Sequence, residues 1–232
     1  MPSLVGSEMC IRDSFLPIAA FVGGAISTFL VYRLSTVAGR TSMATMLLTG
    51  IALAALTGAM TGILTYLSTD QQLRELTFWS MGGLSGATWD KVRVALPFMA
   101  PAFCAAPFLA SALDRLALGE SEAFHLGVRV QTVKRVAILV IAAGVGAAVS
   151  VSGIVGFVGL VAPHLVRLAV GPGHRTLLPA AALLGAGLLA FADLAARTIV
   201  APAELPLGIV TALIGAPFFL YLLLQRSRAG IL

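Results

Sequence analysis

Long apolar segments separated by short polar stretches constrain most strongly what this chain can fold into. These segments cover residues 15–32, 43–67, 94–113, 136–150, 151–170, 177–193 and 205–224. Most approach the roughly 20 residues that an α-helix needs to cross the hydrocarbon core of a bilayer. The ten-residue alternation of a transmembrane β-barrel is absent from the sequence. The pattern therefore predicts an all-α integral membrane protein, built as a polytopic helical bundle.

Composition agrees with a membrane location. The mean hydropathy is +0.99 and 11% of residues are charged, whereas about a quarter are charged in a soluble domain. The 24 glycines allow neighbouring helices to approach closely. The net charge of +5 comes from basic residues scattered between apolar segments, which indicates membrane topology rather than nucleic-acid binding. Cys10 and Cys104 are too far apart in sequence to suggest a metal site or a disulfide framework.

The first fourteen residues, MPSLVGSEMCIRDS, differ from the rest. They lack the basic start and apolar core of a signal peptide, and they lack helical periodicity. The string resembles translated adaptor sequence. We expect residues 1–14 to be a non-native or disordered extension and residues 15–232 to form the membrane domain. A genuine polar start outside the membrane is the alternative.

The region 136–170 is long for one span and short for two, at about 20 residues each. Two crossings place ten basic residues on one side and five on the other, whereas one crossing gives seven against eight. The positive-inside rule favours two crossings, with the larger set in the cytoplasm. The larger set is Arg33, Arg40, Arg115, Arg129, Lys134, Arg135, Arg167, Arg175, Arg226 and Arg228, and the smaller is Arg12, Arg74, Lys91, Arg93 and Arg197.

Local signals refine this topology. We expect a turn near Ser150–Gly153, followed by a bent or broken second crossing, because Pro163 and several glycines lie in it. The polar loop after residue 67 is expected outside, with a short amphipathic helix over residues 70–79. Trp79 and Trp89 suit the membrane–water boundary.

A charged stretch interrupts the apolar pattern between residues 114 and 130. Burying its five charges would cost roughly 13–17 kcal/mol, at ~2.5–3.5 kcal/mol each. They are Asp114, Arg115, Glu120, Glu122 and Arg129. The stretch must therefore lie in water or against another protein.

The same stretch carries apolar residues that a solvated loop does not need: Leu116, Leu118, Phe124, Leu126 and Val128. Residues 121–123 are compatible with a helix, and Gly127 can end it in the left-handed conformation. A short helix with an apolar face is suited to a groove on a partner protein. A loop packed against its own chain is the alternative.

Several motifs give a more specific indication. The "EA…LG" pattern within LALGESEAFHLGV resembles the coupling loop of ABC importer permeases. The segments MGGLSGATW, SGIVGFVGLVAPHLVRL, GHRTLLPAAALLGA and AARTIVAPAELPLGIVTALIGAPFFLYLLL resemble, in this order, the FecCD/BtuC-type permeases for iron–siderophore complexes, haem and vitamin B12. The resemblance covers about residues 15–228. It implies the type II importer bundle of ten helices, of which about seven are present here.

The resemblance also implies partners. Family permeases pair as two copies, in this case a homodimer, and bind two cytoplasmic ATPase subunits and a periplasmic or lipid-anchored substrate-binding protein. Residues 114–132 would be the cytoplasmic coupling loop, with Gly119, Glu120, Ala123, Leu126 and Gly127 docking on the ATPase. The chain lacks the G-x-x-x-x-G-K-[ST] phosphate loop. ATP would therefore be used by the partner, and no permanently bound cofactor is expected.

Arg197 is the external candidate site. In the resembling family an arginine at this place meets a carboxylate of the binding protein, a role that suits the planar guanidinium fork. The alternative is an internal ion pair with Asp193, four residues earlier, or with Glu204. We expect Glu204 instead to cap the helix entered at Pro206. His164 is expected at the inner boundary rather than as a ligand of haem iron.

The resemblance implies that the second and last spans line the pathway, with Thr49, Thr57, Thr61 and Thr211 as polar lining groups. The implied function is import of a ferric chelate, haem or iron–siderophore, across the bacterial inner membrane, with the C-terminus in the cytoplasm. Vitamin B12 import is one alternative. An ion-coupled secondary transporter is another, although such proteins place ionisable residues near mid-membrane and here charges gather at segment ends.

Overall fold

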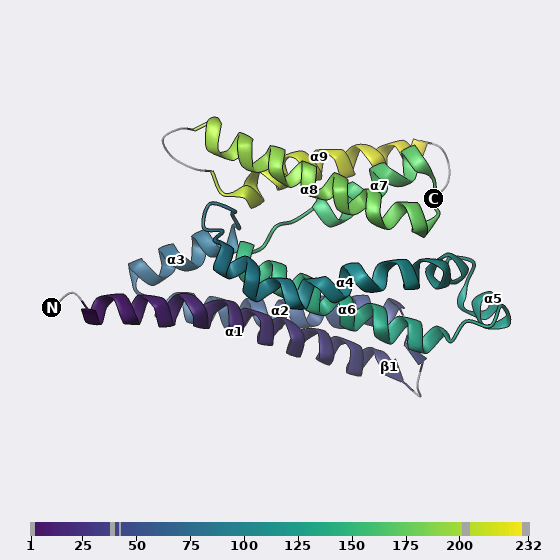
Figure 1. Cartoon of the computed structure of the whole chain (residues 1–232), viewed down its shortest axis with the longest axis horizontal. Coiled ribbons are helices and arrows are strands. Elements are labelled where there is room, and N and C mark those ends of the chain that lie inside the picture. The colour runs from purple at the N-terminus through teal and green to yellow at the C-terminus, as the bar shows by residue number, and fades with distance from the viewer. Residues whose placement is uncertain (1–2, 38–39, 42, 201–204, 229–232) are drawn as a thin grey trace. The chain divides into compact units, whose positions relative to one another are not determined.

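The computed structural model describes residues 3–37, 40–41, 43–200 and 205–228, and these fold almost entirely into helices (Figure 1). The helices are α1 Ser3–Ser35, α2 Met43–Leu67, α3 Asp70–Ser80, α4 Trp89–Leu116, α5 Glu120–His125, α6 Val130–Ser152, α7 Val158–Val170, α8 His174–Thr198 and α9 Leu207–Arg228. Two short strands, β1 Thr36–Val37 and β2 Arg40–Thr41, pair antiparallel with Thr36 opposite Thr41.

The apolar segments predicted from sequence correspond in order to helices. Within the described part of the chain, four are long and apolar enough to cross a membrane: Ala44–Leu67, Trp89–Leu116, Val130–Ser152 and His174–Thr198. Three shorter apolar helices cover Ala19–Ser35, Val158–Val170 and Leu207–Leu222. The all-α class is therefore confirmed. The helix expected over residues 70–79 is also present, as α3.

The backbone of residues 3–14 is helical and continuous with the first apolar segment. The sequence of this stretch lacks helical periodicity, so the helix is not signalled by the local pattern. Once the apolar segment forms a helix, each added residue extends it without a new nucleation step, so a weak local propensity suffices. That residues 1–14 are an extension separate from the membrane domain of residues 15–232 stays a prediction.

The helices form two compact units. The first comprises residues 1–76 and 88–151, and the second comprises residues 77–87 and 152–232. In the first unit α1 lies against α6, where a Cβ at Gly146 would stand 3.4 Å from the ring of Phe21. Phe21 also stacks on Phe98 of α4, with ring centroids 4.6 Å apart. Gly146 thus allows the close approach on which this packing depends.

In the second unit three glycines form a backbone crossing that we call the glycine joint, comprising Gly82, Gly153 and Gly208. The N–H groups of Leu207 and Gly208 donate to the carbonyl oxygens of Gly82 (3.0 Å) and Met81 (2.9 Å). The N–H of Gly83 donates to the carbonyl of Ser152 at 2.8 Å. The end of α3, the start of α9 and the end of α6 are thereby joined.

The glycine joint has no room for side chains. A Cβ at Gly208 would overlap the carbonyl oxygen of Met81, and a Cβ at Gly153 would overlap that of Trp79. Gly82 and Gly153 also adopt φ values of +68° and +69°, which other residues rarely adopt. Backbones approach this closely in a membrane bundle only where small residues permit it.

The region 136–170 forms two helices, as expected. Helix α6 ends at Ser152, Gly153 turns the chain, and residues 153–157 are not helical before α7 begins at Val158. Since α7 has 13 residues, it is shorter than the roughly 20 that a straight crossing needs. The second segment is thus an unwound stretch followed by a short helix, which agrees with the bent or broken form expected, and its crossing of the membrane stays a prediction. Its unwound start is covered by protein, because Val155 packs on the core of Ala192, Ala196, Leu207 and Val210.

Candidate functional site

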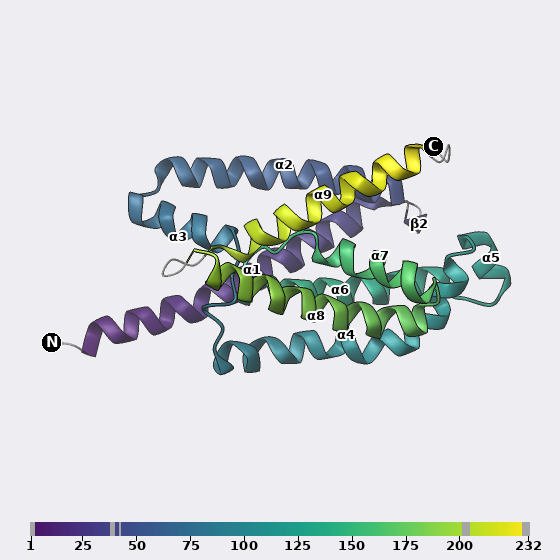
Figure 2. The ribbon, with the colours of Figure 1, turned by 90° about the horizontal axis from the view of Figure 1, so that it is seen from above.

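Helix α5 and its flanking turns form a compact projection beyond the ends of α4 and α6 (Figures 1 and 2). Gly119 precedes the helix with φ +116° and ψ 154°, a conformation open essentially to glycine alone. Its carbonyl accepts the first bond of the helix, from the N–H of Ala123 at 3.0 Å. Gly119 therefore sets the sharp entry into α5.

The end of α5 is a Schellman motif. The N–H of Val128 donates to the carbonyl of Ala123 at 2.9 Å, and the N–H of Gly127 donates to that of Phe124 at 3.0 Å. Gly127 has φ +80°, the left-handed conformation that this motif requires. The prediction that Gly127 ends the helix is confirmed.

The apolar residues of the segment divide into two groups. Ala123 is fully buried and clusters with Val128 and Val130, against which Leu116 of α4 packs. Phe124 is 69% exposed, and Leu118 and Leu126 are exposed as well. The prediction of one outward apolar face is wrong for Leu116 and Val128, because the Schellman turn folds them back onto the segment's own small core.

Polar contacts tie the projection to its supporting helices. The ammonium group of Lys134, buried in α6, lies 2.5 Å from the carboxylate of Glu120. Arg115 at the end of α4 donates from Nη1 to the carbonyl of Leu126 at 3.3 Å. Sequence reasoning missed Lys134. The signal was a lysine at the start of an apolar helix, close in sequence to an acidic segment. The result is a small, braced helix with an exposed apolar surface.

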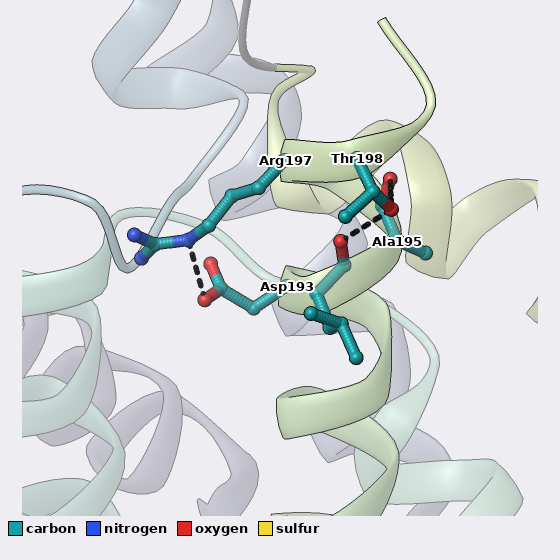
Figure 3. A network of polar contacts seen from close by, with 5 residues as sticks. Asp193, Ala195, Arg197 and Thr198 are labelled. Carbon is teal, nitrogen blue, oxygen red and sulfur yellow. Dashed lines mark hydrogen bonds and ion pairs between the residues drawn. The ribbon is translucent and has the colours of Figure 1, made fainter. Parts of the chain in front are cut away.

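Arg197 lies in the last turn of α8 (Figure 3). Its Nε donates to Oδ2 of Asp193 at 2.8 Å, so the ion pair with Asp193 that was the alternative to docking does form. Glu204 lies outside the described residues. The carbonyl of Ala196 accepts from the N–H of Leu205 at 3.1 Å, which places Arg197 next to the start of α9 and close to the glycine joint.

The four threonines predicted to line the pathway differ in their exposure to solvent. Thr57 and Thr61 are exposed on α2, and their hydroxyls donate to backbone carbonyls one turn earlier, at 2.9 Å each. Thr49 lies on the same helix and is half-buried. Thr211 of α9 is buried, and its hydroxyl donates to the carbonyl of Gly208 at 3.1 Å. Lining of a pathway by these groups stays a prediction.

His164 of α7 lies edge-on to Phe218 of α9, with ring centroids 6.3 Å apart. Among the residues that the structure describes, no group of three or more His, Cys, Asp or Glu side chains is arranged to hold a metal ion. The surroundings of His164 are those of a packed aromatic contact between helices.

Comparison with known proteins agrees with this architecture. The sequence profile described as the FecCD transport family matches residues 5–225. The chain is 47% identical over 215 residues to the hemin transport system permease protein of Yersinia pestis, covering 92% of this chain and 64% of that protein. It is 45% identical over 209 residues to the cobalamin import system permease protein of Halobacterium salinarum, covering 90% of this chain and 56% of that one.

A third relative is the vitamin B12 import system permease protein of Vibrio vulnificus, 42% identical over 91% of this chain and 63% of that protein. Among solved structures, an inward-facing metal-chelate type ABC transporter matches with a TM-score of 0.74 and 35% identity, over 79% of this chain and 60% of that one. This match confirms the membrane bundle of an ABC transporter permease. The chain spans between 56% and 64% of the length of these relatives.

Proposed function

Because the chain belongs to the FecCD transport family, we propose that it acts as the membrane-spanning permease subunit of an ATP-driven importer. The observation that carries this proposal is α5, a braced helix with an exposed apolar surface outside the predicted membrane spans. Such a surface is suited to a groove on a partner. A permease in this role is not itself an enzyme.

In this proposal α5 transmits force between the ATPase and the pathway. Phe124, Leu126 and Leu118 supply the apolar contact. Gly119 and Gly127 fix the direction of the helix, Ala123 packs it on the segment's core, and Glu120 ties it to Lys134. Closure of the ATPase subunits on ATP would displace α5, and its attachment to α4 and α6 would carry the displacement into the membrane. ATP is bound and hydrolysed by the separate ATPase chain.

The proposed substrate is a ferric chelate, haem or an iron–siderophore complex. The name of the Yersinia pestis relative, a hemin transport permease at 47% identity, supports haem. Vitamin B12 is the alternative, supported by the cobalamin and vitamin B12 permeases at 45% and 42% identity. The threonines of α2 suit a pathway that passes a bulky chelate without strong ligands.

The proposed assembly is a homodimer of permeases with two ATPase subunits, surrounded by lipid in the bacterial inner membrane. The larger set of basic residues and the C-terminus would face the cytoplasm. Arg197 would face outward and dock a carboxylate of the substrate-binding protein. Its Nε is held by Asp193, which leaves the two Nη groups at the far edge of the guanidinium for a bidentate contact.

An ion-coupled mechanism has less support. Helix α2 contains no Asp, Glu, His, Lys or Arg, and α8 contains none of these between Arg175 and Asp193. Ion-coupled transporters carry such groups near the middle of the membrane.

A pull-down tests the docking role of α5. The tagged full-length gene is expressed with its neighbouring reading frames, and the complex is extracted in mild detergent. We expect an ATPase to co-purify with wild type and to be lost in Phe124→Ser. The matched control is Phe78→Ser, which changes a similarly exposed phenylalanine on α3. Retention of the ATPase by Phe124→Ser, or equal loss in both variants, contradicts the proposal.

Uptake by the same cells tests the substrate. Haem, a ferric hydroxamate and cobalamin are supplied separately, and accumulation is measured with and without ATP depletion. We expect ATP-dependent accumulation of a ferric chelate. Accumulation of cobalamin alone would support the alternative substrate, and uptake that follows the proton gradient instead of ATP would support ion coupling.

A further inference from the structure

The end of α1 meets the start of α6 in a polar contact within the first unit. Nε of Arg135 donates a hydrogen bond to the phenolic oxygen of Tyr32 at 2.9 Å, across 103 residues of sequence. The same helices pack at Phe21 and Gly146. Two separate contacts therefore set α1 alongside α6 and fix the Tyr32–Arg135 pair at one end of their shared surface.

This contact leaves donors for a ligand. Because Arg135 donates from Nε, the opposite edge of its guanidinium, formed by one N–H of each Nη group, remains available to an acceptor. The Tyr32 oxygen accepts from Arg135, so its own hydroxyl proton is a further donor. Arg33 follows Tyr32 in the sequence, and its guanidinium lies 5.8 Å from the centre of the Phe29 ring, a cation–π contact that restrains the side chain.

Positive charge dominates this end of the two helices. Arg33, Arg135 and Arg129 are exposed. The adjacent Lys134 is buried and pairs with Glu120, so that carboxylate is engaged elsewhere. The exposed arginines therefore favour an anion.

Exposed apolar residues adjoin the arginines, before Arg33 on α1 and after Arg135 on α6. Phe29 and Leu30 of α1 and Val136 and Leu139 of α6 are all exposed, Leu139 to 68%. Tyrosine and arginine at the end of such a surface occupy the depth of lipid headgroups. An anion bound by these arginines would lie directly next to this exposed apolar surface.

We propose that Tyr32, Arg33 and Arg135 bind the phosphate of an anionic phospholipid, whose acyl chains lie along Phe29 and Leu139. The shared chemistry is a phosphate ester held by two guanidinium groups and a phenol. The adjoining apolar surface favours a phosphate that belongs to a lipid over free phosphate. The positive-inside rule requires only basic residues in loops, whereas here two arginines are restrained by specific contacts beside exposed apolar side chains.

Native mass spectrometry of the full chain tests the proposal, with dioleoylphosphatidylglycerol and dioleoylphosphatidylcholine as probes. We expect the phosphatidylglycerol to bind at least tenfold more tightly. Arg33→Gln and Arg135→Gln should each weaken its binding about fivefold, which corresponds to roughly 1 kcal/mol per basic residue near an anionic lipid. Tyr32→Phe should weaken it about two- to threefold, a smaller loss because a neutral donor is removed. Binding of phosphatidylcholine should not change in any of these variants.

The matched control is Arg93→Gln, an exposed arginine of α4 in the first unit. Equal loss in this variant would show general charge attraction and overturn the site, as would equal affinity of wild type for the two lipids. Inorganic phosphate at millimolar concentration should not displace the lipid, and full displacement would identify free phosphate as the ligand instead. The wild-type comparison of lipids holds even where a variant fails to fold.

Discussion

The ammonium group of Lys134 lies 2.5 Å from the carboxylate of Glu120, although 14 residues separate them in sequence. The Lys134 side chain is 4% exposed, whereas that of Glu120 is about half exposed. The ion pair therefore joins a buried position in α6 to the accessible first turn of α5. A partner that moves α5 would act directly on α6 through this contact.

Glu120→Gln tests the bracing of α5. The substitution removes the charge that faces a buried ammonium group, and we expect it to destabilise the chain by about 1–2 kcal/mol, below the cost of a fully buried pair because Glu120 is partly solvated. Thermal unfolding in lipid nanodiscs measures this. Glu122→Gln, in the same turn and exposed, should leave the unfolding temperature unchanged. Equal effects of the two variants would show that the pair contributes nothing specific.

Features with a local signal were predictable from the sequence. Gly127 indicated the end of α5, and the glycines after Ser150 indicated the break before α7, because Gly127 and Gly153 adopt left-handed conformations that glycine reaches more easily than other residues. Helix α3 followed from its amphipathic pattern. In each case the cause and the structure lie within a few residues of one another.

Features that depend on distant segments were not predictable. The glycine joint brings Met81 to Gly208, and the lipid-site contact brings Tyr32 to Arg135. Nothing near any of these residues in the chain specifies its partner. The inward turn of Val128 was missed for a related reason, since it follows from the Schellman hydrogen bonds rather than from apolar spacing.

Gly127→Ala tests the turn that ends α5. A Cβ at this position would meet nothing within 4 Å, so the cost is conformational, about 1–2 kcal/mol for a left-handed alanine. We expect lower thermal stability and weaker ATPase co-purification. Gly127→Asn should lower the thermal stability less than Gly127→Ala does, because asparagine adopts the left-handed conformation more readily than alanine. Gly62→Ala, in the interior of α2 and also without near neighbours, should be neutral or slightly stabilising, and a comparable loss there would contradict this reasoning.

Gly208→Ala tests the glycine joint. The new Cβ would overlap the Met81 carbonyl, and the backbone cannot retreat without breaking the bonds from Leu207 and Gly208. We expect destabilisation of about 1–3 kcal/mol from overpacking, seen as a lower unfolding temperature in nanodiscs. Gly187→Ala lies within α8 with nothing within 4 Å and should be neutral or stabilising by about 0.5–1 kcal/mol. Similar shifts in both variants would mean that the joint tolerates a side chain.

Substitutions at Arg197 and Asp193 test whether this pair serves docking of the substrate-binding protein or stability of the fold. An i,i+4 pair at a helix surface contributes only about 0.3–0.5 kcal/mol, so neither Arg197→Lys nor Asp193→Asn should lower the unfolding temperature measurably. Docking of the substrate-binding protein should respond differently. Lysine keeps the charge but cannot contact a carboxylate with two parallel hydrogen bonds, and we expect about tenfold weaker binding.

Asp193→Asn keeps Arg197 but replaces the charge-assisted bond to its Nε with a weaker neutral one, so the guanidinium would be held less firmly with its Nη edge outward. We expect the complex with the binding protein to dissociate several-fold faster in nanodisc binding kinetics, while association at low salt is unchanged or faster because a negative charge has been removed. Slower dissociation would instead mean that Asp193 competes with the partner's carboxylate for Arg197. Wild-type binding by Arg197→Ala would remove the arginine from the docking surface altogether.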